Sequence, residues 1–251
     1  MDTLNRFSNR VENYIKFRPD YPAEIIPFLK QHLLLSSETV IADIGSGTGI
    51  SAELFLKQGN VVYGVEPNKE MREAAERLLK AYPNFYSIDA TAENTSLPTD
   101  DIDLIIAGQA FHWFDKQKCR TEFHRILKPG GSVILMWNDR RTDSTPFLRA
   151  YEDFIKMFAT DYNEVNHKNI SDEVFNNFFE GDYKMESFLN YQHLDLEGLK
   201  GRILSSSYMP AEGHKDFDFM MSVLKKIFTR FQENGTVSIE YDTKLYYGKL
   251  S

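Results

Sequence analysis

Short apolar runs alternate with helical patterns between residues 40 and 137. Five of these runs are continuous and bounded by turn residues, which is typical of strands buried in a parallel sheet; they cover 40–44, 61–65, 85–88, 103–107 and 132–137. Helical spacing is found over 51–58 and 116–127, and from Met71 to Leu79, where Asn68 is a suitable N-cap. This alternation predicts a doubly wound α/β sheet with right-handed crossovers.

The pattern changes after residue 138. Helices are predicted over 145–159, 196–205 and 217–231, and a polar, Asn-rich stretch extends to residue 177. The last segment, 236–250, alternates in part and predicts antiparallel pairing at a sheet edge. We therefore expect a single domain in four parts: an N-terminal segment over 1–38, a core over 39–138, a mainly helical region over 139–235 and a terminal strand over 236–251.

Composition and charge exclude several classes of function. The 251 residues include 29 Lys plus Arg against 37 Asp plus Glu, a net charge of −8, so no nucleic-acid partner is expected. The single cysteine, Cys119, excludes an intramolecular disulfide and a Cys-based zinc cluster, and the six histidines lack the spacing of metal ligands. The polar start is unlike a signal peptide, and no run of about 18 apolar residues occurs. We expect a cytoplasmic protein without a membrane or metal site.

A glycine-rich turn joins the first predicted strand to the first predicted helix. Residues 43–49 read DIGSGTG, and glycines there let the backbone turn tightly and approach a ligand. Glu66 follows Gly45 by 21 residues and ends the second strand, where its carboxylate can accept both ribose hydroxyls of an adenosine. The spacing is G-x-G-x-G and not the dinucleotide pattern G-x-G-x-x-G. Asp43 before it suits a ligand with an ammonium group and would repel a pyrophosphate.

These features resemble motif I of the class I S-adenosylmethionine-dependent methyltransferases, D/E-x-G-x-G-x-G. Glu66 occupies the place of that family's ribose-binding acid, and residues 127–131, LKPGG, resemble its turn before the fifth strand. The resemblance covers residues 40–137. It implies a Rossmann-like sheet of seven strands in the order 3-2-1-4-5-7-6, with the last strand antiparallel, under a helical substrate cover. It also implies S-adenosyl-L-methionine as cofactor and S-adenosyl-L-homocysteine as product.

The resemblance implies the cofactor site residue by residue. Tyr14 and Arg18 are expected to close over the cofactor, with Arg18 near its carboxylate. Thr91 stands where the family often has an aspartate, so a side-chain contact to the adenine amine is in doubt, while the backbone of Ala92 can still serve. The full set of expected contacts is Tyr14, Arg18, Asp43, Gly45, Ser46, Gly47, Glu66, Pro67, Asn68, Met71, Thr91, Ala92 and Gln109.

Three further segments are similar to the small-molecule methyltransferases related to trans-aconitate methyltransferases. They are residues 110–115, AFHWFD; residues 14–22, YIKFRPDYP; and residues 201–208, GRILSSSY. The first follows the fourth strand, whose end faces the methyl group in this family. The substrate-site candidates are His112, Trp113, Arg140 and Tyr208.

Each substrate-site candidate has a structural alternative. His112 is either a general base or a ring packed between its aromatic neighbours, and we favour packing. Arg140 and Arg141 either hold an anionic substrate or are solvated loop charges. Tyr208 either lines the substrate pocket or packs in the core.

We expect S-adenosylmethionine-dependent methyl transfer to a small molecule, at a carboxylate or hydroxyl oxygen. The Asn/Asp-Pro-Pro-Tyr/Phe signature of amino-directed methyltransferases is absent after the fourth strand. Two alternatives stay open: an NAD-dependent oxidoreductase on the same fold, and a non-catalytic S-adenosylmethionine-binding regulatory protein. No protein partner is implied.

Overall fold

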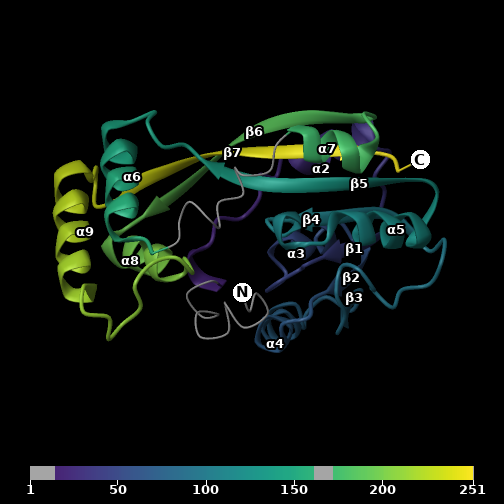
Figure 1. Cartoon of the computed structure of the whole chain (residues 1–251), viewed down its shortest axis with the longest axis horizontal. Coiled ribbons are helices and arrows are strands. Elements are labelled where there is room, and N and C mark those ends of the chain that lie inside the picture. The colour runs from purple at the N-terminus through teal and green to yellow at the C-terminus, as the bar shows by residue number, and fades with distance from the viewer. Residues whose placement is uncertain (1–14, 161–171, 251) are drawn as a thin grey trace.

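A seven-stranded sheet runs through the computed structural model, which describes residues 15–160 and 172–250 (Figure 1). The strands are β1 (Val40–Ile44), β2 (Val61–Val65), β3 (Phe85–Ile88), β4 (Ile102–Gly108), β5 (Leu127–Arg140), β6 (Tyr183–Leu194) and β7 (Val237–Gly248). Their order is β3-β2-β1-β4-β5-β7-β6. Strands β1 to β5 pair in parallel, and β7 is antiparallel to both β5 and β6. The predicted fold class and strand order are confirmed.

Helices connect and flank these strands. They are α2 (Ile25–His32), α3 (Ile50–Leu56), α4 (Lys69–Leu78), α5 (Lys116–Ile126), α6 (Pro146–Phe158), α7 (Asp172–Phe179), α8 (Leu196–Leu204) and α9 (Phe217–Phe231), with a 3₁₀ turn, η2 (Phe111–Trp113). Side chains at several N-termini accept an otherwise unpaired backbone N–H: Asn68 caps α4, Asp115 caps α5 and Asp195 caps α8. No helix in the described ranges is long and apolar enough to cross a bilayer.

Three apolar cores hold the molecule together. Two lie on opposite faces of the sheet, so the central strands β1 and β4 are buried on both sides. The third joins α6, α8 and α9 to the distal ends of β6 and β7. Figure 1 shows these three helices as a separate helical body, away from β1 to β4, with the long strands β5, β6 and β7 connecting the two regions.

One expectation for the second half needs correction. The segment 236–250 was expected at a sheet edge, yet β7 lies between β5 and β6, and β6 is the edge strand. The region 139–235, expected to be mainly helical, contains α6, α7, α8 and α9, and in addition the twelve-residue strand β6, which was not predicted. Most side chains of β6 are exposed or half-buried, so the strand has no buried apolar run to reveal it.

Candidate functional site

The glycine turn after β1 lies against the segment after β4. The backbone N–H of Gly45 donates to the Val65 carbonyl at 2.8 Å, which fixes the turn beside β2. Gly45 has a φ of +68°, and a Cβ there would lie 2.6 Å from the Ala110 Cβ. A glycine is therefore required both by the left-handed backbone and by the close approach of the two segments.

Glu66 is held by the backbone at the end of β2. Its Oε2 accepts the Gly47 N–H at 2.9 Å and its Oε1 accepts the Asn68 N–H at 2.8 Å. Burial raises the pKa of the Glu66 carboxyl, and these two hydrogen bonds offset part of that effect. Because each oxygen accepts a single N–H here, each retains lone-pair capacity for a ligand hydroxyl.

Asp43 is the second acidic group of the turn, and its side chain is fully buried. Its Oδ2 accepts a hydrogen bond from the Ser51 hydroxyl at 2.7 Å, while its Oδ1 has no partner among the described residues. Burial, with a smaller contribution from the charge of Glu66, raises the pKa of Asp43 to about 7. A buried carboxylate oxygen without a donor calls for a donor from a ligand.

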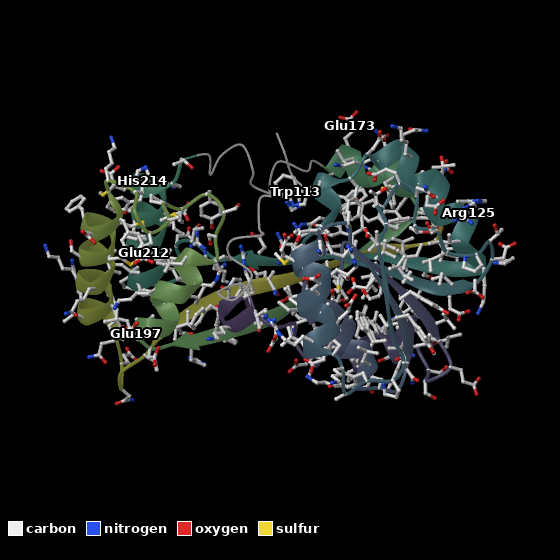
Figure 2. All side chains as sticks on the ribbon, turned by 90° about the horizontal axis from the view of Figure 1, so that it is seen from below. Trp113, Arg125, Glu173, Glu197, Glu212 and His214 are labelled. Atoms are coloured by element: carbon white, nitrogen blue, oxygen red, sulfur yellow. The ribbon has the colours of Figure 1, made fainter. Side chains whose placement is uncertain are left out.

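A cavity of about 370 Å³ opens beside the turn, within the size range of small-molecule sites. Its lining residues are Gly45, Gly47, Glu66, Pro67, Asn68, Met71, Thr91, Ala92, Glu93, Gly108, Gln109, Ala110, Trp113 and Phe114. Trp113 lies on the side of the sheet region that faces the helical body (Figure 2). The lining combines the Glu66 carboxylate with the aromatic rings of Trp113 and Phe114, which suits a ligand with both polar and apolar parts.

Most residues expected at the cofactor line this cavity. Asp43 and Ser46 are buried behind the lining. Arg18 is outside it, with Nη2 donating to the Ser205 carbonyl at 3.0 Å in the helical body. Tyr14 lies outside the described residues.

Of the substrate-site candidates, Trp113 alone is among the cavity-lining residues. The His112 ring packs on Trp113 at a centroid distance of 4.6 Å, and its carbonyl accepts from the Lys116 ammonium at 3.1 Å. Arg140 forms an ion pair with Glu152, away from the cavity. Tyr208 is half-buried against the core of the helical body.

Four lining residues were not among the expected contacts: Glu93, Gly108, Ala110 and Phe114. Glu93 also accepts the Asp115 N–H at 2.9 Å and so joins the segment after β3 to the start of α5. Ala110 and Phe114 belong to the same AFHWFD segment as Trp113. Their signal was therefore present in the sequence, because a segment that follows a central strand lies at the site.

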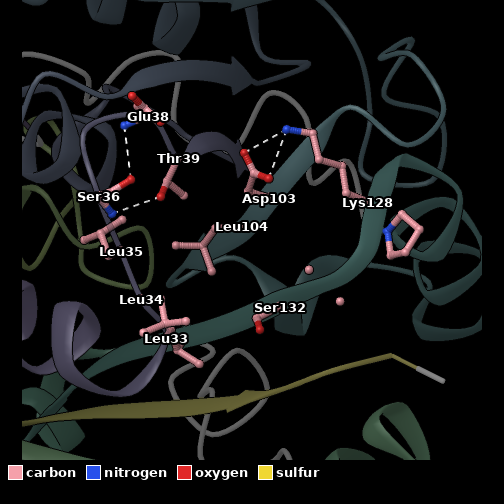
Figure 3. Close-up of a pocket in the computed structure, with 13 residues that line it drawn as sticks. Leu33, Leu34, Leu35, Ser36, Glu38, Thr39, Asp103, Leu104, Lys128 and Ser132 are labelled. Atoms are coloured by element: carbon pink, nitrogen blue, oxygen red, sulfur yellow. Dashed lines mark hydrogen bonds and ion pairs between the residues drawn. The ribbon is translucent and has the colours of Figure 1, made fainter.

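A second depression of about 500 Å³ lies at the amino ends of β1 and β4 (Figure 3). Its charged groups are paired: Lys128 Nζ lies 2.9 Å from both carboxylate oxygens of Asp103, and Asp103 Oδ2 also accepts the Val40 N–H at 2.8 Å. Ligands of open α/β sheets bind at the carboxyl ends of the strands. The smaller cavity is therefore the candidate site. No metal-binding cluster of three His, Cys, Asp or Glu occurs in the described ranges.

In sequence the chain is similar to known methyltransferases. Residues 42–135 match a family described as a methyltransferase domain. Over 244 residues the chain is 25% identical to an uncharacterized methyltransferase of Schizosaccharomyces pombe, covering 96% of this chain and 95% of that protein.

Solved structures agree in fold. A protein of Anaeromyxobacter dehalogenans assigned as a type II methyltransferase superposes with a TM-score of 0.69 at 19% identity, over 93% of this chain and 98% of that one. Haemonchus contortus phosphoethanolamine N-methyltransferase 2, in complex with phosphomonomethylethanolamine and S-adenosylhomocysteine, gives 0.56 at 15% identity, over 99% and 59% of the two chains. These identities show the fold alone. The sheet thus has the strand order of the Rossmann-like methyltransferase fold, and residues 42–135 are similar to the methyltransferase domain family.

Proposed function

We propose that this protein transfers a methyl group from S-adenosylmethionine to an oxygen of a small-molecule acceptor. The observation that carries the proposal is the Glu66 carboxylate, held at the cavity by the Gly47 and Asn68 N–H groups with acceptor capacity to spare. The match to a methyltransferase domain favours methyl transfer over hydride transfer on the same fold.

The residues present fit this cofactor. Glu66 supplies acceptors for two ribose hydroxyls. Asp43 lies behind the lining, and its Oδ1, which has no partner among the described residues, supplies negative charge toward an ammonium group. Gly47 lines the cavity, and apart from its chain neighbours no atom of the described residues lies within 4 Å of where its Cβ would be, so a ligand can approach its backbone. S-adenosylhomocysteine in the Haemonchus contortus enzyme supports the same cofactor class here.

The chain's own residues do little chemistry in this proposal. The bound cofactor supplies an electrophilic methyl group together with its leaving group. The protein orients the acceptor oxygen in line with that methyl group and excludes water, for which Trp113 and Phe114 are placed at the cavity wall. A carboxylate acceptor needs no base, because it is already ionised at neutral pH.

His112 provides the test of this last point, in an assay of labelled methyl transfer from S-adenosylmethionine to a panel of small acids and alcohols. We expect transfer by the wild-type protein, and we expect His112→Asn to lower kcat less than ten-fold, since the ring packs on Trp113 outside the cavity lining. A loss of about 10²–10⁴-fold would identify His112 as a general base. Absence of transfer to every compound, with cofactor bound, would favour the regulatory protein.

A further inference from the structure

Lys116 places a positive charge at the start of α5, where the helix dipole disfavours one. The first turn of α5 contains no acidic residue, and its N-cap is Asp115. Lys118 in the same turn is exposed and lies 3.4 Å from the Asp115 carboxylate. Lys116 is half-buried and has different partners. Local helix chemistry therefore does not explain a lysine at position 116.

The Lys116 ammonium binds two carbonyls of the segment before its own helix. Its Nζ donates to the His112 carbonyl at 3.1 Å and to the Phe114 carbonyl at 2.8 Å. The η2 turn makes its own hydrogen bonds to other carbonyls, those of Ala110 and Phe111. Lys116 therefore supplies donors to two carbonyls that the turn itself does not satisfy.

An aromatic ring and partial burial strengthen this contact. Nζ lies 5.4 Å from the centroid of the Phe111 ring, which is fully buried, and the face of such a ring attracts a cation. Burial lowers the pKa of the Lys116 ammonium from its ordinary value, as expected of a group partly withdrawn from water. Hydrogen bonds from a charged donor are stronger in such surroundings than at an exposed position.

The segment that Lys116 holds forms the aromatic part of the cavity lining. Trp113 and Phe114 both line the cavity. The Phe114 ring also packs on the glycine turn, since a Cβ on Gly45 would lie 3.2 Å from the Phe114 Cζ. A shift of residues 112–114 would therefore move both rings relative to the glycine turn.

We propose that Lys116 is a positioning residue of the candidate site: its ammonium fixes the backbone of residues 112–114 and so sets the rings of Trp113 and Phe114 against the bound cofactor. The assignment rests on the proposed function, because that function gives the cavity its cofactor. It also gives the His112 carbonyl a part in the site that is separate from the packing of the His112 ring.

Four variants test the role of the ammonium. Lys116→Met removes it and keeps an unbranched side chain of similar length, Lys116→Gln keeps a neutral donor, and Lys116→Arg keeps a charged group with donors for two carbonyls. Lys118→Met is the matched control, since it removes an exposed ammonium from the same turn of α5. All four are expected to melt within about 5 °C of the wild-type protein. A larger fall in all three Lys116 variants would make Lys116 a residue of the fold and overturn the proposal.

Acrylamide quenching of tryptophan fluorescence reports on the turn without a ligand. The chain has two tryptophans, and Trp137 is only 3% exposed, so quenching comes mainly from the half-buried Trp113. The quenching constant of Lys116→Met is expected to exceed that of the wild-type protein by about 1.5-fold or more, because a loosened turn exposes the indole. Lys116→Arg and Lys118→Met should match the wild-type protein. An unchanged constant in Lys116→Met would overturn the proposal.

Titration with S-adenosylhomocysteine tests the effect on the site. The Kd is expected to rise about five-fold or more in Lys116→Met and by less in Lys116→Gln. It should stay within two-fold of the wild-type value in Lys116→Arg and Lys118→Met. Equal Kd values for Lys116→Met and the wild-type protein would overturn the proposal. Failure of the wild-type protein to bind, with the quenching difference present, would overturn the proposed function and not the hold of Lys116 on the turn.

Discussion

Glu66→Ala is expected to weaken the binding of S-adenosylhomocysteine by about 1–3 kcal/mol, which is roughly a 5- to 150-fold rise in Kd. The variant removes two acceptor oxygens from the cavity and leaves the Gly47 and Asn68 N–H groups without their side-chain partner. The affinity of Glu66→Gln should lie between those of the wild-type protein and Glu66→Ala, since glutamine keeps the side-chain volume and one acceptor oxygen. Isothermal titration calorimetry measures all three proteins directly.

Glu73→Ala is the control for Glu66. It removes a carboxylate from α4, where Glu73 is exposed and pairs only weakly with Lys69 at 3.7 Å. Its affinity for S-adenosylhomocysteine should match that of the wild-type protein. An unchanged affinity in Glu66→Ala would remove Glu66 from the cofactor site and with it the observation on which the proposed function depends.

The stability of Asp43→Asn relative to the wild-type protein is expected to rise as pH rises. Burial raises the pKa of Asp43 to about 7 from its ordinary value of 3.8, so between these values the folded chain holds a proton that the unfolded chain has lost. The free energy of unfolding of the ligand-free protein therefore falls as pH rises through this window and levels off above about 7. From pH 5 to pH 8 the loss is about 2–3 kcal/mol, and Asp43→Asn does not incur it.

Denaturant unfolding at pH 5 and pH 8 measures this difference. The stability of Asp43→Asn relative to the wild-type protein should rise by about 2–3 kcal/mol between the two pH values. At pH 8 the variant should also bind S-adenosylhomocysteine more weakly, since its ammonium group loses a carboxylate partner. Asp89→Asn, whose exposed side chain pairs with Arg72, is the control. Parallel pH profiles for Asp43→Asn and the wild-type protein would contradict the burial argument.

The central strands β1 and β4 could be predicted because they are buried on both faces. Strands β1, β2 and β3 begin and end where their apolar runs do. In the second half, β6 pairs on one side only and has mostly exposed side chains, so it leaves no such run. Helix α7 was hidden by its asparagines, although its buried Phe175, Phe178 and Phe179 have the i, i+3, i+4 spacing of one helical face.

Part of the candidate site could also be predicted from the sequence, and part could not. The glycine turn and Glu66 are local features, and short-range geometry brings them to the cavity. The ion pair between Arg140 and Glu152 depends on where α6 docks, which periodicity alone does not specify. The hydrogen bond from the Arg202 Nε to the Tyr241 hydroxyl, two residues 39 positions apart in sequence, depends in the same way on how α8 packs on β7.

Titration of the purified protein with S-adenosylmethionine, S-adenosylhomocysteine and NAD tests the central claim most directly. The geometry of Glu66 and Asp43 predicts micromolar binding of both sulfur compounds, about −8 kcal/mol, and no binding of NAD. Binding of NAD, or failure of both sulfur compounds to bind, would contradict the assignment of this cavity to the methyl donor.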